Sequence, residues 1–122
     1  MTALELGRAL VEMCKRGENR EAKQRFYAAD VVSVEPYPIP GSPRPAETRG
    51  IQDAIAKGEA FGANFELHHA QIEGPWPHGD QFIVRFTYDV TRRASGERLK
   101  LDEMALYTVA GDKIVREAFF YP

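Results

Sequence analysis

The chain has 122 residues, enough for one domain with a substantial core and too few for two. Its hydrophobic fraction of 43% and charged fraction of 28% are typical of a soluble globular protein. The net charge is −2 and no basic run exceeds Arg92-Arg93, so we expect neither a nucleic-acid nor a membrane partner. The N-terminal residues lack the apolar segment of a signal peptide, and Cys14 is the single cysteine. We therefore expect a cytoplasmic protein without a disulfide or a cysteine-based metal site.

Two helices are predicted at the N-terminal end. Leu4–Lys15 carries apolar residues at helical spacing, and Gly17 ends the pattern. Asn19 is suited to be the N-cap of the second helix. The apolar stripe of this second helix is predicted to consist of Ala22, Phe26 and Tyr27.

A short strand and a long loop follow. The β-branched run Val31–Val34 predicts the strand, and Pro36–Pro45 then holds five of the eight prolines. Together with residues 46–49 this segment predicts a loop of about 14 residues, a length that is usually functional. A third helix is predicted over Gly50–Phe61.

From Asn64 onward the apolar period is two, which predicts strands. The predicted strands and turns are, in order, a strand from Phe65, a turn over Gly74–Gly79, a strand over Phe82–Val90, a turn at Ala94–Gly96, a strand over Arg98–Val109, a turn at Gly111-Asp112 and a strand over Lys113–Tyr121. The predicted fold class is α+β, with the order α-α-β-α-β-β-β-β in one domain over residues 1–122. A curved antiparallel sheet would wrap around three helices.

The last strands are apolar on both faces. A sheet face exposed to water is normally polar, so an apolar outer face predicts a covering partner, and a second copy of the chain is the simplest one. Glu117 and Arg85 share the outer parity and are expected to pair across that homodimer interface. The apolar residues predicted to point away from the helices are Ile83, Met104, Leu106, Val115, Phe119 and Tyr121.

Two acids are predicted to converge on one apolar cavity. Glu35 stands directly before Pro36 where the first strand ends, and Glu103 alternates with apolar or aromatic residues in its strand. An inward carboxylate must be protonated, hydrogen-bonded or paired, and a structural pair with His69 is one possibility. By parity His69 faces the cavity, where it is expected to transfer protons or orient another group. No third ligand stands at metal spacing, so we expect no metal site and no cofactor.

The element order with Glu35-Pro36 closing the first strand, together with the blocks Gly74–Phe86, Glu103–Val109 and Lys113–Tyr121, resembles the SnoaL-like branch of the nuclear-transport-factor-2-like (NTF2-like) superfamily. This superfamily, whose fold is cone-shaped, includes ketosteroid isomerase. The resemblance implies that Glu35 takes the place of the general base of the isomerase. It also implies that Glu103 takes the place of its oxyanion-hole acid.

The oxyanion tyrosine of the isomerase falls near Leu10, which has no hydroxyl. Loss of one such donor typically costs about 3–4 kcal/mol of transition-state stabilisation. Tyr27 or Tyr107 would be the substitutes. The limonene-epoxide hydrolase type of this superfamily needs an Arg and two Asp around a water, whereas Asp89 and Asp102 fall on the outer parity.

The resemblance implies a mostly apolar pocket for a small apolar or cyclic carbonyl compound. If the protein is an enzyme, Glu35 is the expected base, Glu103 the proton donor and His69 an assisting group in a cofactor-free isomerisation, cyclisation or dehydration. The alternative is a non-catalytic ligand-binding or dimerisation module whose acids are structural. The expected ligand contacts are Tyr27, Phe65, Phe86, Tyr88, Tyr107, Phe120 and Trp76, the last at the mouth of the pocket.

Overall fold

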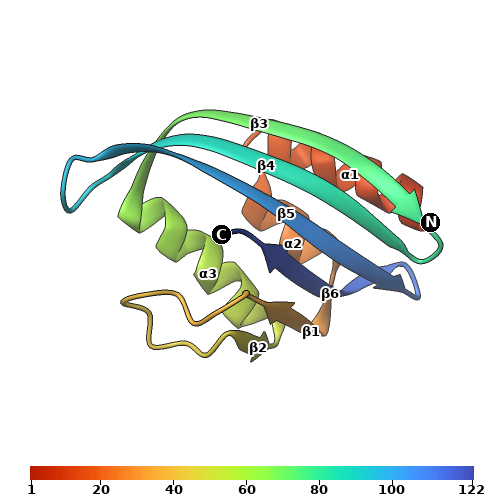
Figure 1. The fold of residues 1–122 in the computed structure, drawn as a ribbon. Coiled ribbons are helices and arrows are strands. Elements are labelled where there is room, and N and C mark those ends of the chain that lie inside the picture. Colours follow the sequence, from red (N-terminus) through yellow and green to blue (C-terminus); the bar gives the residue numbers. More distant parts are fainter.

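A computed structural model describes every residue from Met1 to Pro122. The elements are α1 (Ala3–Lys15), α2 (Asn19–Phe26), β1 (Tyr27–Val34), β2 (Glu47–Arg49), α3 (Ile51–Asn64), β3 (Phe65–His78), β4 (Gln81–Arg92), β5 (Arg98–Ala110) and β6 (Lys113–Phe120). The predicted α+β class and its three helices are confirmed. Figure 1 shows a strongly curved sheet with the helices gathered on one side. None of the helices is long and apolar enough to cross a membrane.

The sheet has six strands in the order β2-β1-β6-β5-β4-β3. Four of its five pairings are antiparallel, as predicted, but β1 runs parallel to β6. The sheet is therefore mixed. Apolar alternation reports which face a residue occupies and carries no information on the direction of the neighbouring strand. This parallel pair places β1, which is early in the sequence, beside β6, which is the last strand.

Three element boundaries differ from the prediction. β1 begins at Tyr27, so this residue belongs to the sheet instead of the apolar stripe of α2. The end of the predicted long loop forms the short strand β2. β3 continues to His78 through the segment predicted as a turn, interrupted by a register shift between Glu73 and Trp76. Prolines are tolerated there because β3 is an edge strand of the sheet.

Local chemistry defines where the helices begin. Thr2 caps α1 in a reciprocal capping box with Glu5, which satisfies two free N–H groups of the first turn. Gly50 precedes α3 with φ of 97°, a left-handed value that favours glycine. Its backbone N–H donates to the carbonyl of Val31, which ties the start of α3 to β1.

The core lies between the helices and the inward residues of the sheet. α1 contributes Leu6, Leu10 and Val11, all at most 2% exposed. The predicted inward parity of β4 and of most of β5 is confirmed, because the alternate residues of each strand are the buried ones. These sheet residues are Phe82, Val84, Phe86, Val90, Ala105, Tyr107 and Val109. Cys14 packs partly buried against this core.

A register shift reverses the predicted faces of β6. The pairing shifts between Thr108 and Val109 of β5, so that Glu117 lies opposite the inward residue Tyr107. A one-residue shift moves every following side chain to the other face of the sheet. Glu117 is therefore buried instead of lying at an outer interface, and Phe119 packs against the core. Phe120, predicted to contact ligand, is 55% exposed.

The outer face of the sheet is nevertheless apolar at its centre. Trp76, Ile83 and Leu106 lie opposite one another on β3, β4 and β5, and Met104 lies opposite Phe120. Trp76 is 49% exposed. Arg85 pairs with Asp102 of the same chain at 2.7 Å, which corrects the predicted pairing with Glu117. We call Trp76, Ile83, Met104, Leu106 and Phe120 the outer apolar face.

Candidate functional site

A pocket of about 470 Å³ opens where the end of β1, the end of α3 and the first half of β5 meet. Its volume falls within the range of small-molecule sites. The pocket is lined by Glu35, Tyr37, Ile39, Phe61, Phe65, Lys100, Leu101, Asp102, Glu103, Tyr121 and Pro122. Glu35 and Glu103, the two acids predicted to share a cavity, thus line the same pocket.

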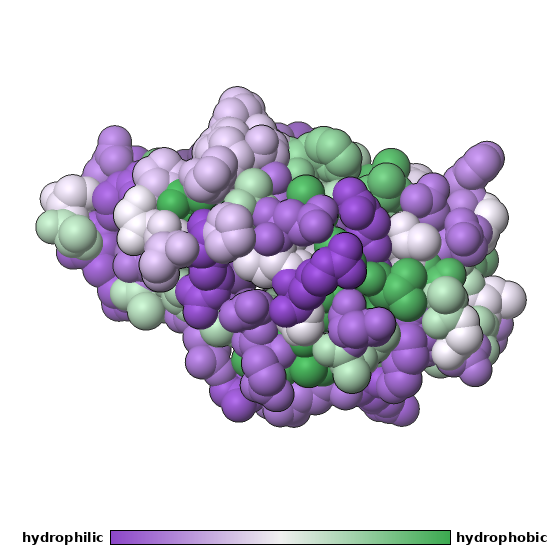
Figure 2. Space-filling view, turned by 90° about the horizontal axis from the view of Figure 1, so that it is seen from below, coloured by the Kyte–Doolittle hydropathy of each residue, from purple (hydrophilic) through white to green (hydrophobic).

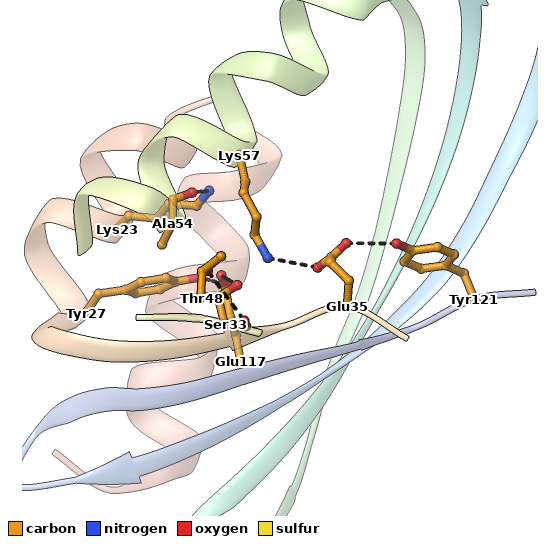
Figure 3. A network of polar contacts seen from close by, with 9 residues as sticks. All are labelled: Lys23, Tyr27, Ser33, Glu35, Thr48, Ala54, Lys57, Glu117 and Tyr121. Carbon is orange, nitrogen blue, oxygen red and sulfur yellow. Dashed lines mark hydrogen bonds and ion pairs between the residues drawn. The ribbon is translucent and has the colours of Figure 1, made fainter. Parts of the chain in front are cut away.

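Glu35 is held from two sides. The Lys57 ammonium donates to Oε2 at 3.0 Å, and the Tyr121 hydroxyl donates to Oε1 at 2.9 Å. In Figure 3, Lys57 reaches down from α3 and Tyr121 approaches from the opposite side. The backbone N–H of Glu35 also donates to the carbonyl of Ala46, which fixes the turn out of β1. The side chains of Lys57 and Glu35 are each 10% exposed, so this ion pair is shielded from solvent screening.

Glu103 has a different environment. No side-chain or backbone group of the chain forms a hydrogen bond or an ion pair with its carboxyl. The pKa of Glu103 is raised to about 7. Burial is the main cause, the charges of Glu35 and Glu117 add to it, and the charge of Lys57 opposes it. A carboxyl with this pKa exchanges its proton near neutrality, which suits a general acid or base.

The polar side chains behind Glu35 all have hydrogen-bond partners within the protein. The carboxyl of Glu117 accepts hydrogen bonds from the hydroxyls of Tyr27 and, at 2.7 Å, of Ser33. Burial raises the pKa of Tyr27 well above its ordinary value, so this hydroxyl stays protonated as a donor. Lys23 donates to the carbonyl of Ala54 at 2.9 Å, and burial lowers its pKa. No buried side-chain nitrogen or oxygen lacks a partner.

The walls of the pocket are largely aromatic. The ring of Phe61 lies 5.1 Å from that of Phe65, and Tyr37 packs edge-to-face on Tyr121 at 5.4 Å. Ile39 and Leu101 add aliphatic surface. Figure 2, which views the molecule from below Figure 1, shows hydrophobic residues between hydrophilic ones on the face that it presents. An apolar ring held against such walls would have one end near the two acids.

The predicted ligand contacts are distributed over the whole sheet. Phe65 lines the pocket, and Tyr88 lies behind it against Phe61 at 5.2 Å. His69 is exposed on β3 and does not line the pocket. The remaining predicted contacts lie either in the core or on the outer face. Tyr27, Phe86 and Tyr107 are buried in the core, whereas Trp76 and Phe120 belong to the outer apolar face.

Sequence reasoning missed Lys57 and Tyr121. Lys57 shares one side of α3 with Ala54 and Phe61, at spacings of three and four residues, so its position on an apolar stripe was a readable signal. The sequence pattern predicts Tyr121 on the outer face, because apolar alternation does not reveal the register shift between β5 and β6. The structure also leaves Tyr27 and Tyr107 away from the pocket; the tyrosines that line it are Tyr37 and Tyr121, and Tyr121 is hydrogen-bonded to Glu35.

A second hollow, of about 400 Å³, lies where α1 and α2 approach the turn between β5 and β6. Two of its charged groups have partners: the N-terminal ammonium of Met1 pairs with Asp112, and Lys113 donates to the carbonyl of Arg25. The structure brings no three His, Cys, Asp or Glu side chains together in a metal-binding arrangement. The pocket with Glu35 and Glu103 is therefore the candidate site.

Comparison with solved structures gives close similarity along the whole chain. A candidate SnoaL-like polyketide cyclase from Mesorhizobium loti, whose name also carries the words carbohydrate phosphatase, is 38% identical, with a TM-score of 0.90 over 99% of this chain and 100% of that one. An NTF2-like protein from Burkholderia thailandensis is 17% identical, with a TM-score of 0.81 over 100% and 92%.

A protein from Catenulispora acidiphila with a ketosteroid isomerase-like fold, solved with trimethylamine, is 18% identical, with a TM-score of 0.71 over 93% and 82%. No curated protein sequence matches the chain significantly. The family model described as SnoaL-like domain matches residues 1–121. The chain therefore belongs to the SnoaL-like domain family and has the NTF2-like fold.

Proposed function

We propose that this protein binds a small apolar or cyclic carbonyl compound and moves a proton next to its carbonyl group without a cofactor. The observation that carries the proposal is the unequal pair of acids in one aromatic pocket. Glu35 is paired with Lys57, whereas Glu103 has no partner and a pKa of about 7. Two acids whose environments differ in this way can act as base and acid at one pH.

The proposed step transfers two protons. The Glu35 carboxylate takes a proton from the carbon next to the carbonyl, and the C–H electron pair forms the carbon–carbon double bond of the enol. The carbonyl oxygen meanwhile receives the proton of Glu103. With a β,γ-unsaturated ketone, Glu35 returns its proton to the γ-carbon while the enol O–H gives its proton back to Glu103 and the carbonyl re-forms, which completes an isomerisation. In a cyclisation, the enol carbon attacks a second carbonyl, whose oxygen takes the proton from Glu35 while the enol O–H returns its proton to Glu103.

The proposal assigns the donor role to Glu103 because the oxyanion tyrosine of the isomerase has no equivalent at Leu10, which is buried in the core. The Tyr121 hydroxyl lines the pocket, but it donates to Glu35. A protonated Glu103 is then the donor to a developing enolate oxygen. Removing such a donor typically costs about 3–4 kcal/mol of transition-state stabilisation.

A second candidate is a binding module for an amine-bearing ligand. Three of the lining residues are acids and one is a lysine, and the aromatic rings beside them suit a cation. The Catenulispora neighbour was solved with trimethylamine. The same charges disfavour a phosphate ester, because Glu35, Asp102 and Glu103 would repel its anionic oxygens.

The proposal also includes assembly as a homodimer through the outer apolar face. Its centre is apolar although no element of the chain covers it, and two of its members are about half exposed. The same patch on two copies would form a closed two-fold interface.

Exchange of the α-hydrogens of cyclohexanone in deuterium oxide, followed by proton NMR, tests the proposed proton transfer. The wild type should accelerate the loss of the α-proton signal, Glu35→Gln should abolish the acceleration, and Glu103→Gln should weaken it. Binding of 2-naphthol, followed by its fluorescence, controls for an intact pocket. Bound 2-naphthol with no accelerated exchange would identify a passive binding pocket and favour the second candidate.

A further inference from the structure

One cation serves two acids in the pocket, and its position makes them unequal. We propose that Lys57 is a positioning residue that keeps Glu35 as the charged acid and leaves Glu103 as the acid that carries the exchangeable proton. This inference rests on the proposed function for its catalytic meaning. Its structural content, the division of charge between the two acids, can be tested without a substrate.

The contacts of Lys57 point to Glu35 alone. Its ammonium lies 3.0 Å from Glu35 Oε2, and both side chains are 10% exposed. Tyr121 occupies the other oxygen of Glu35, so the carboxylate is held in one orientation. Glu103 receives neither contact. Since charge attraction increases steeply at short distance in a shielded site, the cation stabilises Glu35 more than Glu103.

Burying the Lys57 ammonium costs free energy unless a neighbouring group compensates its charge. A buried ammonium loses most of its hydration, and the Glu35 carboxylate supplies the compensation. Its ammonium also lies 5.5 Å from the centre of the Phe119 ring. Two other lysines are near, but Lys23 is committed to the Ala54 carbonyl and Lys100 is exposed at the rim of the pocket. Lys57 is therefore the cation available to the acid pair.

The charges around Glu103 act in opposite directions. Glu35 and Glu117 favour its protonated form, and Lys57 favours its ionised form. The other titratable groups whose charge would act on this carboxyl are three tyrosines: Tyr88 of β4, Tyr107 of β5 and Tyr121 after β6. Their pKa values are raised, so they remain neutral and leave Glu35, Glu117 and Lys57 as the charges that set the state of Glu103.

Without Lys57, Glu35 would keep the Tyr121 hydroxyl but would lose its compensating charge. The repulsion between the two pocket carboxylates would then no longer be relieved beside Glu35 alone, so the proton would no longer be confined to Glu103. With Lys57 present, one arrangement of charge is favoured, with Glu35 ionised and the proton on Glu103. That arrangement is the one that the proposed proton transfer needs.

The test follows the carboxyl carbons of 13C-labelled glutamates by NMR between pH 4 and 9, with assignments from Glu35→Gln and Glu103→Gln. In the wild type, the Glu103 signal should titrate in one step near pH 7. In Lys57→Met, the Glu103 signal should no longer follow that single step, because the cation that opposes its protonation and pairs with Glu35 is gone. Lys57→Arg keeps the charge and should preserve the single step, as should Lys100→Met, which removes a pocket-rim cation that does not contact Glu35.

Lys57→Gln provides the same test if Lys57→Met fails to fold, because its amide can still donate to Glu35 but carries no charge. A single, unshifted Glu103 step in either neutral variant would overturn the inference. Hydrogen exchange of cyclohexanone gives a second readout: the neutral variants should lose about tenfold or more of the rate, while Lys57→Arg restores it. If the wild type shows no exchange, the proposed function fails, and the titration still decides the role of Lys57.

Discussion

Two glutamates in one pocket differ in function here because their neighbours differ. Glu35 has a cation and a hydroxyl on its two oxygens, whereas Glu103 has apolar walls and like charges. The same side chain is thus suited to accept a proton at one position and to donate one at the other. The identity of a residue gives its chemistry, and its contacts give the state in which that chemistry is available.

The raised pKa of Glu103 predicts a pH-dependent stability. The folded pKa of about 7 lies above the ordinary value of 4.5, so the protonated form favours the folded state and its contribution is lost as pH rises from about 4.5 through 7. Glu103→Gln should therefore stabilise the protein relative to the wild type at pH 8 and not at pH 4.5. We expect the difference to change by about 2–3 kcal/mol between these pH values. Urea unfolding at both pH values measures it, and a constant difference would contradict the shifted pKa.

Binding of an enolate-like anion should depend on the proton of Glu103. The affinity for 2,4-dinitrophenolate, which is an anion across this range and is followed by its absorbance, should fall as pH rises through about 7, because ionised Glu103 no longer donates and repels the oxyanion. Glu103→Ala should lose affinity by about tenfold at pH 6, which corresponds to 1.4 kcal/mol, and Glu103→Gln should lose less because its amide still donates. Equal affinity in all three proteins would make Glu103 a structural residue.

At the scale of elements, the pairing of β1 with β6 positions both the core and the site. Glu117 of β6 accepts hydrogen bonds from Tyr27 and Ser33 of β1, which fastens the two strands from the inside. Glu35 is the first residue after β1, and Tyr121 is the first residue after β6. The register shift in β6 is what brings both Glu117 and Tyr121 to the inner face.

Removing the Glu117 carboxyl should destabilise this pair of strands. Glu117→Ala leaves two buried hydroxyls without an acceptor, and we expect a loss of about 2–5 kcal/mol in the free energy of unfolding. Tyr27→Phe removes one donor and should cost about 1–2 kcal/mol. Urea unfolding at pH 7 measures both, with Glu66→Ala on the exposed side of β3 as a control that should change little. A near-neutral Glu117→Ala would show that the network contributes little.

The long Pro36–Pro45 segment shows how a loop becomes part of a site. Its first residues place Tyr37 and Ile39 in the pocket wall, and the residues that follow it form β2, which pairs with β1. The Glu35 N–H bond to Ala46 closes the segment at its base. The backbone of Glu35 is therefore anchored by β1 before it and by the hydrogen bond to Ala46, so its carboxylate has a defined position.

At the scale of the whole molecule, the outer apolar face predicts a dimer. Phe120→Glu or Leu106→Glu would place a charge in the proposed interface, and either should convert dimer to monomer, with aggregation of the exposed face. Light scattering after size exclusion measures the mass. Leu67→Glu alters an exposed apolar residue outside this face and should remain dimeric. A monomeric wild type at micromolar concentration would contradict the proposed assembly.

The sequence by itself determined the element order apart from β2, the three helices, the inward faces of β4 and β5, and the two acids that line the pocket. These features depend on local periodicity and on a residue next to Pro36, and both can be read along one strand or helix. Membership of the SnoaL-like domain family agrees with them. The expected homodimer and the roles of the acids remain predictions.

Only the tertiary structure decided which side chains meet. The parallel pairing of β1 with β6, the register shift that turned Glu117, Phe119 and Tyr121 inward, and the ion pair between Lys57 and Glu35 each depend on two segments distant in sequence. Apolar alternation along a strand predicts which face of the sheet a residue occupies, but only as far as the next bulge. A single added residue moves all following side chains to the opposite face. For that reason the sequence identified Glu35 and Glu103, whereas only the fold could give them different partners.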